Sequence, residues 1–369
     1  YEDVYLARND VSAFKAKVTA FRDGVIKAAA ARGEGKSVPM EISYHKSDYF
    51  FNATLFYVCA FFMLFASLAS TAGVSIRENV GFFAARSGIG TLLRNLTWVP
   101  MLGGAGLAVT GIVIRCIIMQ RPPITSLYET IIFISTLAVI TALIVEAVTR
   151  MGIAMLAGCI GGIAGLTMSI LFMTNDGVDT MQQLEAVLIT NFWLATHVTI
   201  INTGYAICMI AAIFSWIYFG LRLIRVVKGG DQVAKVITTI SYALVAVGLL
   251  FSLVGTVLGG IWANYSWGRF WGWDPKENGA LMIVLMNLII LHARLGGYIR
   301  EVGTHVANVF LGMIVVFSWF GVNQLGVGLH SYGATEGMWR YLSMFWGPQP
   351  ARGVSGTTLP GRPRRGNPP

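Results

Sequence analysis

The chain contains eight apolar stretches that are each long enough to cross a lipid bilayer. Each is close to the length of about 20 residues that a membrane-spanning helix requires. They cover residues 50–72, 97–119, 127–147, 152–174, 191–219, 236–262, 279–295 and 305–323. Only 12% of the 369 residues are charged, whereas soluble proteins carry about a quarter. The sequence therefore predicts an all-α polytopic membrane protein with about eight transmembrane helices.

The distribution of Lys and Arg indicates which connections face the cytoplasm. One set of connections carries Arg77, Arg86, Arg94, Arg150, Arg222, Arg225, Lys228, Lys235, Arg294 and Arg300. The opposite set carries Arg121, Arg269 and Lys276, and its 175–190 connection carries the acids Asp176, Asp179 and Glu185. Because positive charge marks the cytoplasmic side, both termini of this chain and the loop between the sixth and seventh spans are predicted to face outward.

The polar ends of the chain lie outside the spans. Apolar residues recur there at helical spacing after Asp10, a residue suited to an N-cap; they are Val11, Phe14, Val18, Phe21 and Val25. We expect one amphipathic helix, ended by Gly33, Gly35 and Pro39.

The predicted domains are an extracytoplasmic helix and linker (1–45), a transmembrane domain (46–335) and an extracytoplasmic tail (336–369). That tail is rich in Pro, Gly and Arg, which predicts disorder from about residue 347. The start at Tyr1, with no signal peptide, indicates the cut end of a longer chain.

The four cysteines argue against redox or zinc chemistry. Cys59, Cys116, Cys159 and Cys208 each stand alone inside an apolar stretch, and no CxxC occurs. This pattern predicts small buried residues rather than a disulfide framework, a zinc site or a thiol-exchange site. The net charge of +9 is explained by topology, and no segment resembles a nucleic-acid-binding module.

The loop between the sixth and seventh spans reads WGRFWGWDPKEN, residues 267–278. Trp267, Trp271 and Trp273 form an aromatic shelf, with Trp262 just upstream and Asp274, Lys276 and Glu277 following. Such a shelf with charges at the membrane edge suits a large planar apolar ligand with polar ends. The alternative is an interfacial tryptophan belt, although belts spread their tryptophans over several loops.

Two of the five histidines flank this loop on its own side of the membrane. His197 lies near the outer end of the fifth span, and His330 lies just past the outer end of the eighth. Six-coordinate haem iron takes two neutral imidazoles on opposite faces of the ring. The tryptophans would then cover the macrocycle, and Arg269 and Lys276 are candidates to meet its propionates.

The other polar groups near the spans leave alternatives open. His292 is 18 residues from Asp274, about 27 Å along a helix, so it cannot bind the same iron as the outer pair. It is either a ligand of an inner haem or a snorkelling residue. His305 is a candidate second ligand there, although a hydrogen-bonded role is the better interpretation, and His45 reads as a surface residue. Within RPPITSLYET, Ser126 is predicted to cap the helix that starts directly after it. Glu129, at the third position of that helix, is either part of the cap or a contact for ligand.

These motifs together resemble one known family. WGRFWGWDPKE resembles the signature of the WWD superfamily of haem-handling membrane proteins. PPITSLYE, NFWLATHV, LHARL and GLHSYG are similar to the CcsA (ResC) branch of System II cytochrome c biogenesis. The resemblance covers about residues 97–333. It leaves open whether the chain is the C-terminal part of a CcsB–CcsA fusion.

The resemblance implies a membrane protein that carries haem b outward through the bacterial inner membrane or a thylakoid-type membrane. His197 and His330 would hold haem at the Trp-rich loop, and His292 would be an inner iron ligand. The haem would then be joined by thioether bonds to the CxxCH cysteines of apocytochrome c, a holocytochrome c synthase (haem lyase) activity. Implied partners are a CcsB (ResB) subunit or fused half, which supplies the other inner histidine, and a thioredoxin-like thiol reductant.

Two other functions remain open. A membrane electron-transfer subunit would hold two b haems, using His292 and His305 inside and His197 and His330 outside. A haem-free small-molecule transporter would show broken helices, inverted repeats and a midplane site. For the synthase, the protein positions the haem and admits thiols, and no catalytic nucleophile or general base is expected from it.

Overall fold

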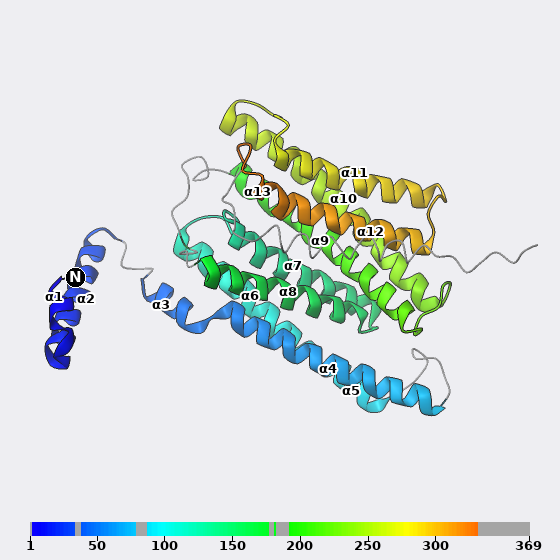
Figure 1. Cartoon of the computed structure of the whole chain (residues 1–369), viewed down its shortest axis with the longest axis horizontal. Coiled ribbons are helices and arrows are strands. Elements are labelled where there is room, and N and C mark those ends of the chain that lie inside the picture. The colour runs from blue at the N-terminus through cyan, green and yellow to red at the C-terminus, as the bar shows by residue number, and fades with distance from the viewer. Residues whose placement is uncertain (1, 34–37, 79–86, 177–180, 182–191, 331–369) are drawn as a thin grey trace, which may run out of the picture.

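The computed structural model describes residues 2–33, 38–78, 87–176, 181 and 192–330. Within these ranges every regular element is a helix and no strand occurs. The elements are α1 (Glu2–Leu6), η1 (Ala7–Asn9), α2 (Val11–Ala31), α3 (Val38–Ser47), α4 (Tyr49–Glu78), α5 (Gly88–Leu96), α6 (Trp98–Met119), α7 (Leu127–Thr149), α8 (Ile153–Asp176), α9 (Phe192–Leu223), α10 (Gln232–Trp267), α11 (Pro275–Leu295), α12 (Glu301–Val316), η4 (Phe317–Gly321) and α13 (Val322–Gln324). Figure 1 shows their arrangement.

Among the described residues, eight helical segments are long and apolar enough to cross a membrane, which confirms the predicted polytopic all-α fold. They are Val38–Gly73, Gly88–Met119, Leu127–Thr149, Ile153–Thr174, Phe192–Leu223, Gln232–Trp267, Pro275–Leu295 and Glu301–Gln324. Most of these helices extend beyond the apolar stretches predicted from the sequence, because backbone hydrogen bonding continues into polar residues at the helix ends. The acids Asp179 and Glu185 and the tail from residue 347 lie outside the described residues.

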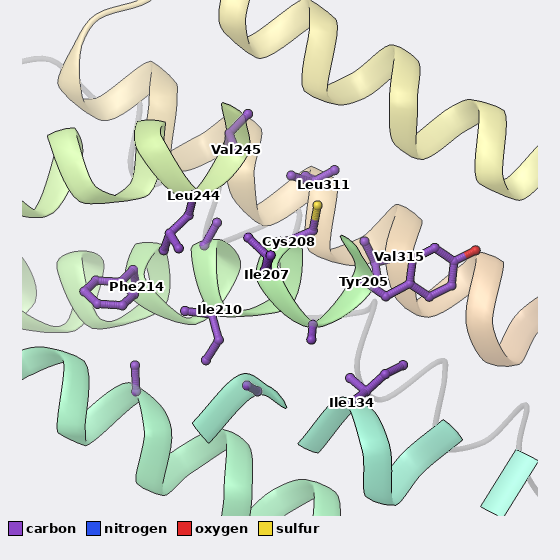
Figure 2. Close-up of a cluster of buried hydrophobic side chains, with 14 of the residues drawn as sticks. Ile134, Tyr205, Ile207, Cys208, Ile210, Phe214, Leu244, Val245, Leu311 and Val315 are labelled. Carbon is purple, nitrogen blue, oxygen red and sulfur yellow. The ribbon is translucent and has the colours of Figure 1, made fainter. Parts of the chain in front are cut away.

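Two apolar cores hold the bundle together. The larger core joins α7 and α8 to α9–α12 and is centred on α9 (Figure 2), where Ile207, Cys208 and Ile210 are buried. The smaller core joins α3, α4, α6, α7 and α8, and includes Tyr57 and Met101. Helices α7 and α8 contribute to both cores, so they lie between α4 and α6 on one side and α9–α12 on the other (Figure 1).

Local sequence signals explain where the key helices begin and end. Asp10 caps α2 by accepting the amides of Ser12 and Ala13, as predicted. Ser126 and Glu129 form the predicted capping box of α7. At α11 Asp274 is the N-cap, Pro275 occupies the first turn and Glu277 completes a second capping box. Capping satisfies amides that have no partner within the helix, so the two loops that precede α7 and α11 are fixed to their helices.

Three details of the sequence interpretation need correction. Pro39 does not end the amphipathic helix but lies in the first turn of α3, where its missing N–H costs nothing. All four cysteines are free, as expected, but Cys59 is exposed on α4 and Cys116 is only half-buried. A cysteine on the outer face of a membrane-spanning helix contacts lipid rather than protein, so an apolar sequence context did not distinguish the two environments.

Candidate functional site

A pocket of about 1030 Å³ opens at the end of the bundle that carries the Trp-rich loop. This volume includes the space that is open to solvent at the mouth of the pocket. Its walls come from the loop before α7, the start of α7, α9, α10, the Trp-rich loop, α11, η4 and α13. His197 and His330 both line it, although they are far apart in the sequence. Trp262, which is 1% exposed, packs against both imidazoles.

The imidazole of His197 is held on α9 by the backbone of α10. Its Nδ1 lies 2.8 Å from the carbonyl oxygen of Gly255, so the hydrogen is on Nδ1. A close approach of α10 makes this possible, because a Cβ on Gly259 would lie 2.5 Å from Cε1 of His197. The tautomer that results presents Nε2 as the nitrogen that can bind a metal.

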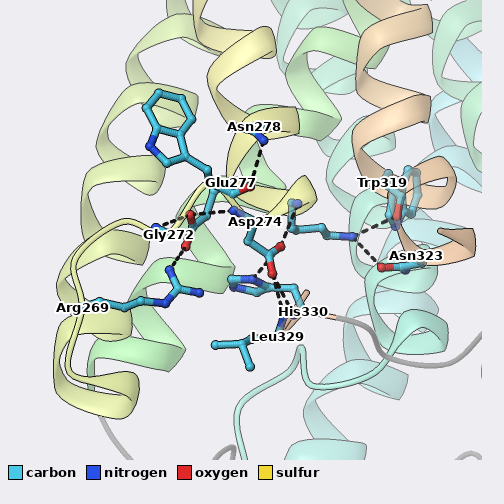
Figure 3. A network of polar contacts seen from close by, with 11 residues as sticks. Arg269, Gly272, Asp274, Glu277, Asn278, Trp319, Asn323, Leu329 and His330 are labelled. Atoms are coloured by element: carbon cyan, nitrogen blue, oxygen red, sulfur yellow. Dashed lines mark hydrogen bonds and ion pairs between the residues drawn. The ribbon is translucent and has the colours of Figure 1, made fainter. Parts of the chain in front are cut away.

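The imidazole of His330 is held by a carboxylate. Its Nδ1 lies 3.1 Å from Oδ1 of Asp274, and the backbone N–H groups of Leu329 and His330 donate to Oδ2 of the same side chain (Figure 3). Gly328 has a φ of +90°, and a Cβ there would overlap this carboxylate. Asp274 therefore fixes both the backbone and the ring of His330, and again Nε2 is the metal-binding nitrogen.

Asp274 remains ionised in this setting. Burial by itself would raise the pKa of its carboxyl, but hydrogen bonds from His330, the Lys276 amide and the Leu329 amide outweigh burial and lower the pKa to about 2. An ionised carboxylate only accepts hydrogen bonds. The hydrogen between the two side chains therefore belongs to Nδ1 of His330.

The tryptophans of the loop take different positions. Trp271 lines the pocket together with Trp262. Trp267 packs edge-on against Trp262 and His330. Trp273 is 69% exposed and has a φ of +58°, a strained conformation of the kind that concentrates at functional sites. Of the three tryptophans predicted to form the shelf, only Trp271 therefore lines the pocket, where it is joined by Trp262, while Trp273 is exposed beside Trp271.

Arg269 and Glu277 clamp the loop to the start of α11. The carboxylate of Glu277 accepts hydrogen bonds from Nη1 of Arg269 at 3.2 Å, the amide of Gly272 at 2.8 Å and the amide of Asp274 at 3.1 Å (Figure 3). The Arg269 guanidinium also lies over the Trp267 ring. Arg269 is therefore bound to a carboxylate and an indole of its own loop.

Lys276 joins the start of α11 to η4 and α13. Its Nζ donates to the carbonyl oxygen of Trp319 at 3.0 Å and to Oδ1 of Asn323 at 3.1 Å. Residues Phe317–Gly321 form a turn of π-helix, a feature that is frequent at functional sites. Lys276, Trp319 and Asn323 all line the pocket.

Glu129 holds the part of the pocket wall that is formed by the loop before α7. Its carboxylate is 3% exposed and accepts from Arg115 at 3.2 Å and Arg121 at 2.9 Å. It also accepts from the amide and hydroxyl of Thr125 and from the amide of Ser126. The backbone around Thr125 and Ser126 forms part of the pocket wall. Glu129 itself is not among the lining residues, so it supports the wall from behind.

The remaining histidines lie elsewhere. His305 is 0% exposed; its Nδ1 is 2.9 Å from the Ser215 hydroxyl, and its Nε2 is 3.1 Å from the Thr238 hydroxyl. His292 is exposed on α11, with Nδ1 2.8 Å from the Leu288 carbonyl oxygen. His45 is exposed on α3. Hydrogen bonding thus occupies both nitrogens of His305, as the favoured interpretation expected.

Several residues of the site were missed in the sequence. Arg115, 3% exposed inside α6, stands in an otherwise apolar span, and a charge in such a position is a signal of function or pairing. The D-P-K-E pattern at 274–277 is a capping-box signature that was treated only as a group of charges. Trp319 and Asn323 carried no signal, because their contact with Lys276 depends on the π turn.

Comparison with known proteins gives a consistent result. The model of a family described as "Cytochrome C assembly protein" matches residues 124–330, from the pocket wall before α7 to His330. "Cytochrome c biogenesis protein CcsA" of Chlamydomonas reinhardtii is 32% identical over 219 residues, which cover 57% of this chain and 61% of that protein. The protein of the same name from Synechococcus sp. (strain CC9605) is 32% identical over 249 residues, covering 57% and 78%. That from strain CC9311 is 30% identical over 279 residues, covering 63% and 87%.

Proposed function

The chain belongs to the cytochrome c assembly protein family, as a CcsA relative with a role in cytochrome c biogenesis, and we propose that it presents haem b for covalent attachment to apocytochrome c. In this proposal the pocket faces outward and His197 and His330 bind the haem iron. The observation that carries it is the pair of imidazoles in one pocket, each with Nδ1 held by a protein oxygen. A ligating histidine usually has its other nitrogen held in this way.

The residues around the two imidazoles fit haem as the substrate. Trp262 and Trp271 offer apolar surface to the macrocycle, and Lys276 offers positive charge within the same pocket. Thioether formation adds the S–H of a cysteine across a haem vinyl group, so the C–S bond and a new C–H bond form with no net change in oxidation state. The contribution of the protein is to hold the ring and admit the thiols.

The exposed position of His292 supports the proposal that a partner subunit is present. It is exposed on α11, and an ionisable side chain on the outer face of a membrane-spanning helix is costly unless something pairs with it. In our proposal His292 is an inner iron ligand, and the opposite ligand comes from a CcsB-type chain or fused half. Apocytochrome c and a thiol reductant are the other proposed partners.

The electron-transfer alternative is less well supported. It needs His305 as an iron ligand, but both nitrogens of His305 are engaged by the hydroxyls of Ser215 and Thr238. The transporter alternative needs broken helices near the midplane. In the described part of the chain the eight spans are continuous, and the π turn η4 lies near the end of the span Glu301–Gln324.

The proposal is tested by the reduced-minus-oxidised absorbance of the purified chain, produced with a CcsB-type partner and supplied haem. We expect a b-type spectrum. Addition of an apocytochrome with a CxxCH motif should give haem that stays attached to the cytochrome on a denaturing gel. A preparation that never acquires haem under these conditions would rule out the proposal.

Asp274→Asn is expected to weaken haem binding by roughly 10–100-fold, the usual cost of losing an outer-shell partner of a ligating histidine. Asparagine remains a good N-cap, so α11 should stay folded. The measurement is a haemin titration followed by absorbance. Asp231→Asn is the matched control, because Asp231 is the N-cap of α10 and does not line the pocket. Equal affinities for the two variants would contradict the assigned role of Asp274.

Gly259→Ala is expected to weaken haem binding by at least about tenfold, because the new Cβ would displace His197 from the Gly255 carbonyl. Gly106→Ala, where a Cβ meets nothing within 4 Å, is the control for a glycine-to-alanine change in a membrane-spanning helix. Haemin titrations of the two variants provide the comparison. An unchanged affinity in Gly259→Ala would show that the position of His197 does not matter.

A further inference from the structure

Among the described residues, Lys276 is the one Lys or Arg that lines the pocket. Arg269, the other basic residue of the Trp-rich loop, does not line it, because its guanidinium is bound to Glu277 and lies over the Trp267 ring. The two basic residues of the loop therefore have different roles. One is neutralised within the loop, and the other brings a positive charge to the pocket.

Among the described residues, Lys276 has no acid as a direct hydrogen-bond or ion-pair partner, although the charge of Asp274 acts on it from a greater distance. Its two hydrogen-bond acceptors, the Trp319 carbonyl and the Asn323 amide oxygen, are neutral. In the part of the chain that the structure describes, no carboxylate lies within 4.0 Å of its ammonium. An ammonium has three N–H donors, so two neutral acceptors leave one donor for a ligand.

Its position makes this charge costly. Lys276 is in the first turn of α11, where the helix dipole favours anions and disfavours cations. The two acids of the same turn are engaged elsewhere: Asp274 binds His330, and Glu277 binds Arg269. Since a half-buried, unpaired cation at a helix N-terminus is unfavourable in itself, a bound anion would offset its cost.

We propose that the ammonium of Lys276 binds a haem propionate and that Arg269 does not. This inference rests on the proposed function and adds how the haem is oriented. The pocket would recognise the propionate-bearing edge of the ring at Lys276, beside Trp319 and Asn323. Because the vinyl groups lie on a different edge of the porphyrin, those groups would be directed away from Lys276. Neutralisation of Glu277 by Arg269 also removes a carboxylate charge that would repel the propionate.

The test compares haemin with haemin dimethyl ester, in which both propionates are esterified and uncharged. Each is titrated into wild-type protein, Lys276→Met, Lys276→Gln and Arg269→Met, and binding is followed by the shift of the haem absorbance band. We expect wild-type protein to bind haemin at least tenfold more tightly than the ester. Both Lys276 variants should bind the two ligands within about twofold of each other, whereas Arg269→Met should keep the wild-type preference.

Each result bears on the inference. Lys276→Gln keeps a hydrogen-bond donor without the charge, so it separates loss of charge from loss of the contacts to Trp319 and Asn323. The inference is overturned if wild-type protein shows no preference, if the Lys276 variants keep it, or if Arg269→Met loses it. Absence of any haem binding by wild-type protein overturns the proposed function and this inference together, which is a distinct outcome from binding without preference.

Discussion

His197→Ala and His330→Ala are each expected to lose most of the b-type haem absorbance of the protein, and the double variant is expected to lose all of it. Both imidazoles line one pocket and pack against Trp262. Loss of a direct iron ligand should exceed the roughly 10–100-fold cost of losing an outer-shell contact. The measurement is the reduced-minus-oxidised spectrum at equal protein concentration, with a haemin titration for each variant.

His45→Ala is the matched control for these variants. His45 is exposed on α3 and has no part in the pocket, so its replacement should leave the spectrum unchanged. Added imidazole should restore absorbance to the single variants by entering the space that alanine leaves, and it should not do so for a misfolded protein. Full low-spin absorbance in both single variants would mean that other groups hold the iron.

The membrane-spanning framework was predictable because it depends on local composition. A span needs about 20 apolar residues wherever it packs, and the eight predicted spans lie in the helices that form the bundle. The caps at Asp10 and Ser126 were predictable for the same reason, because a cap involves residues three positions apart. Features that depend on a few consecutive residues are therefore recoverable from one sequence.

The interior of the site depends on contacts between distant residues. Asp274 and His330 are 56 positions apart, and no spacing in the sequence shows that the carboxylate holds that imidazole. Arg269 and Lys276 were equivalent candidates for a propionate, yet the loop turns one toward Glu277 and the other toward Trp319 of η4. Which charge is neutralised depends on how the loop folds, and this decides which residue is left for a ligand.

Glu129→Ala is expected to destabilise the folded protein by about 3–5 kcal/mol, the cost of leaving a buried charge without its partner. The carboxylate binds Arg115 and Arg121 and three donors of the loop before α7. Thermal unfolding in detergent should show a Tm several degrees below that of the wild-type protein. Haem affinity should fall as well, because that loop forms a wall of the pocket.

A matched pair of conservative variants isolates the contribution of the arginines. Glu129 and Glu146 are both buried on α7, near opposite ends. Glu146 accepts the amide of Gly152, and no Lys or Arg of the described residues lies within 4.0 Å of it. Glu129→Gln should therefore lower Tm more than Glu146→Gln, since only Glu129 is hydrogen-bonded to guanidinium groups.

Haem affinity then shows whether the ion cluster matters to the site as well as to the fold. Glu146 lies at the end of α7 away from the pocket, so Glu146→Gln should leave haemin binding unchanged even if it lowers Tm. Glu129→Gln should weaken both, because the Thr125 and Ser126 contacts of the carboxylate position the pocket wall. Equal Tm decreases for the two variants would mean that the arginines contribute nothing measurable. Unchanged haem affinity in Glu129→Gln would mean that the pocket wall before α7 keeps its position without the carboxylate charge. The capping hydroxyl of Ser126 and the adjacent prolines Pro122 and Pro123 would then be sufficient to hold it.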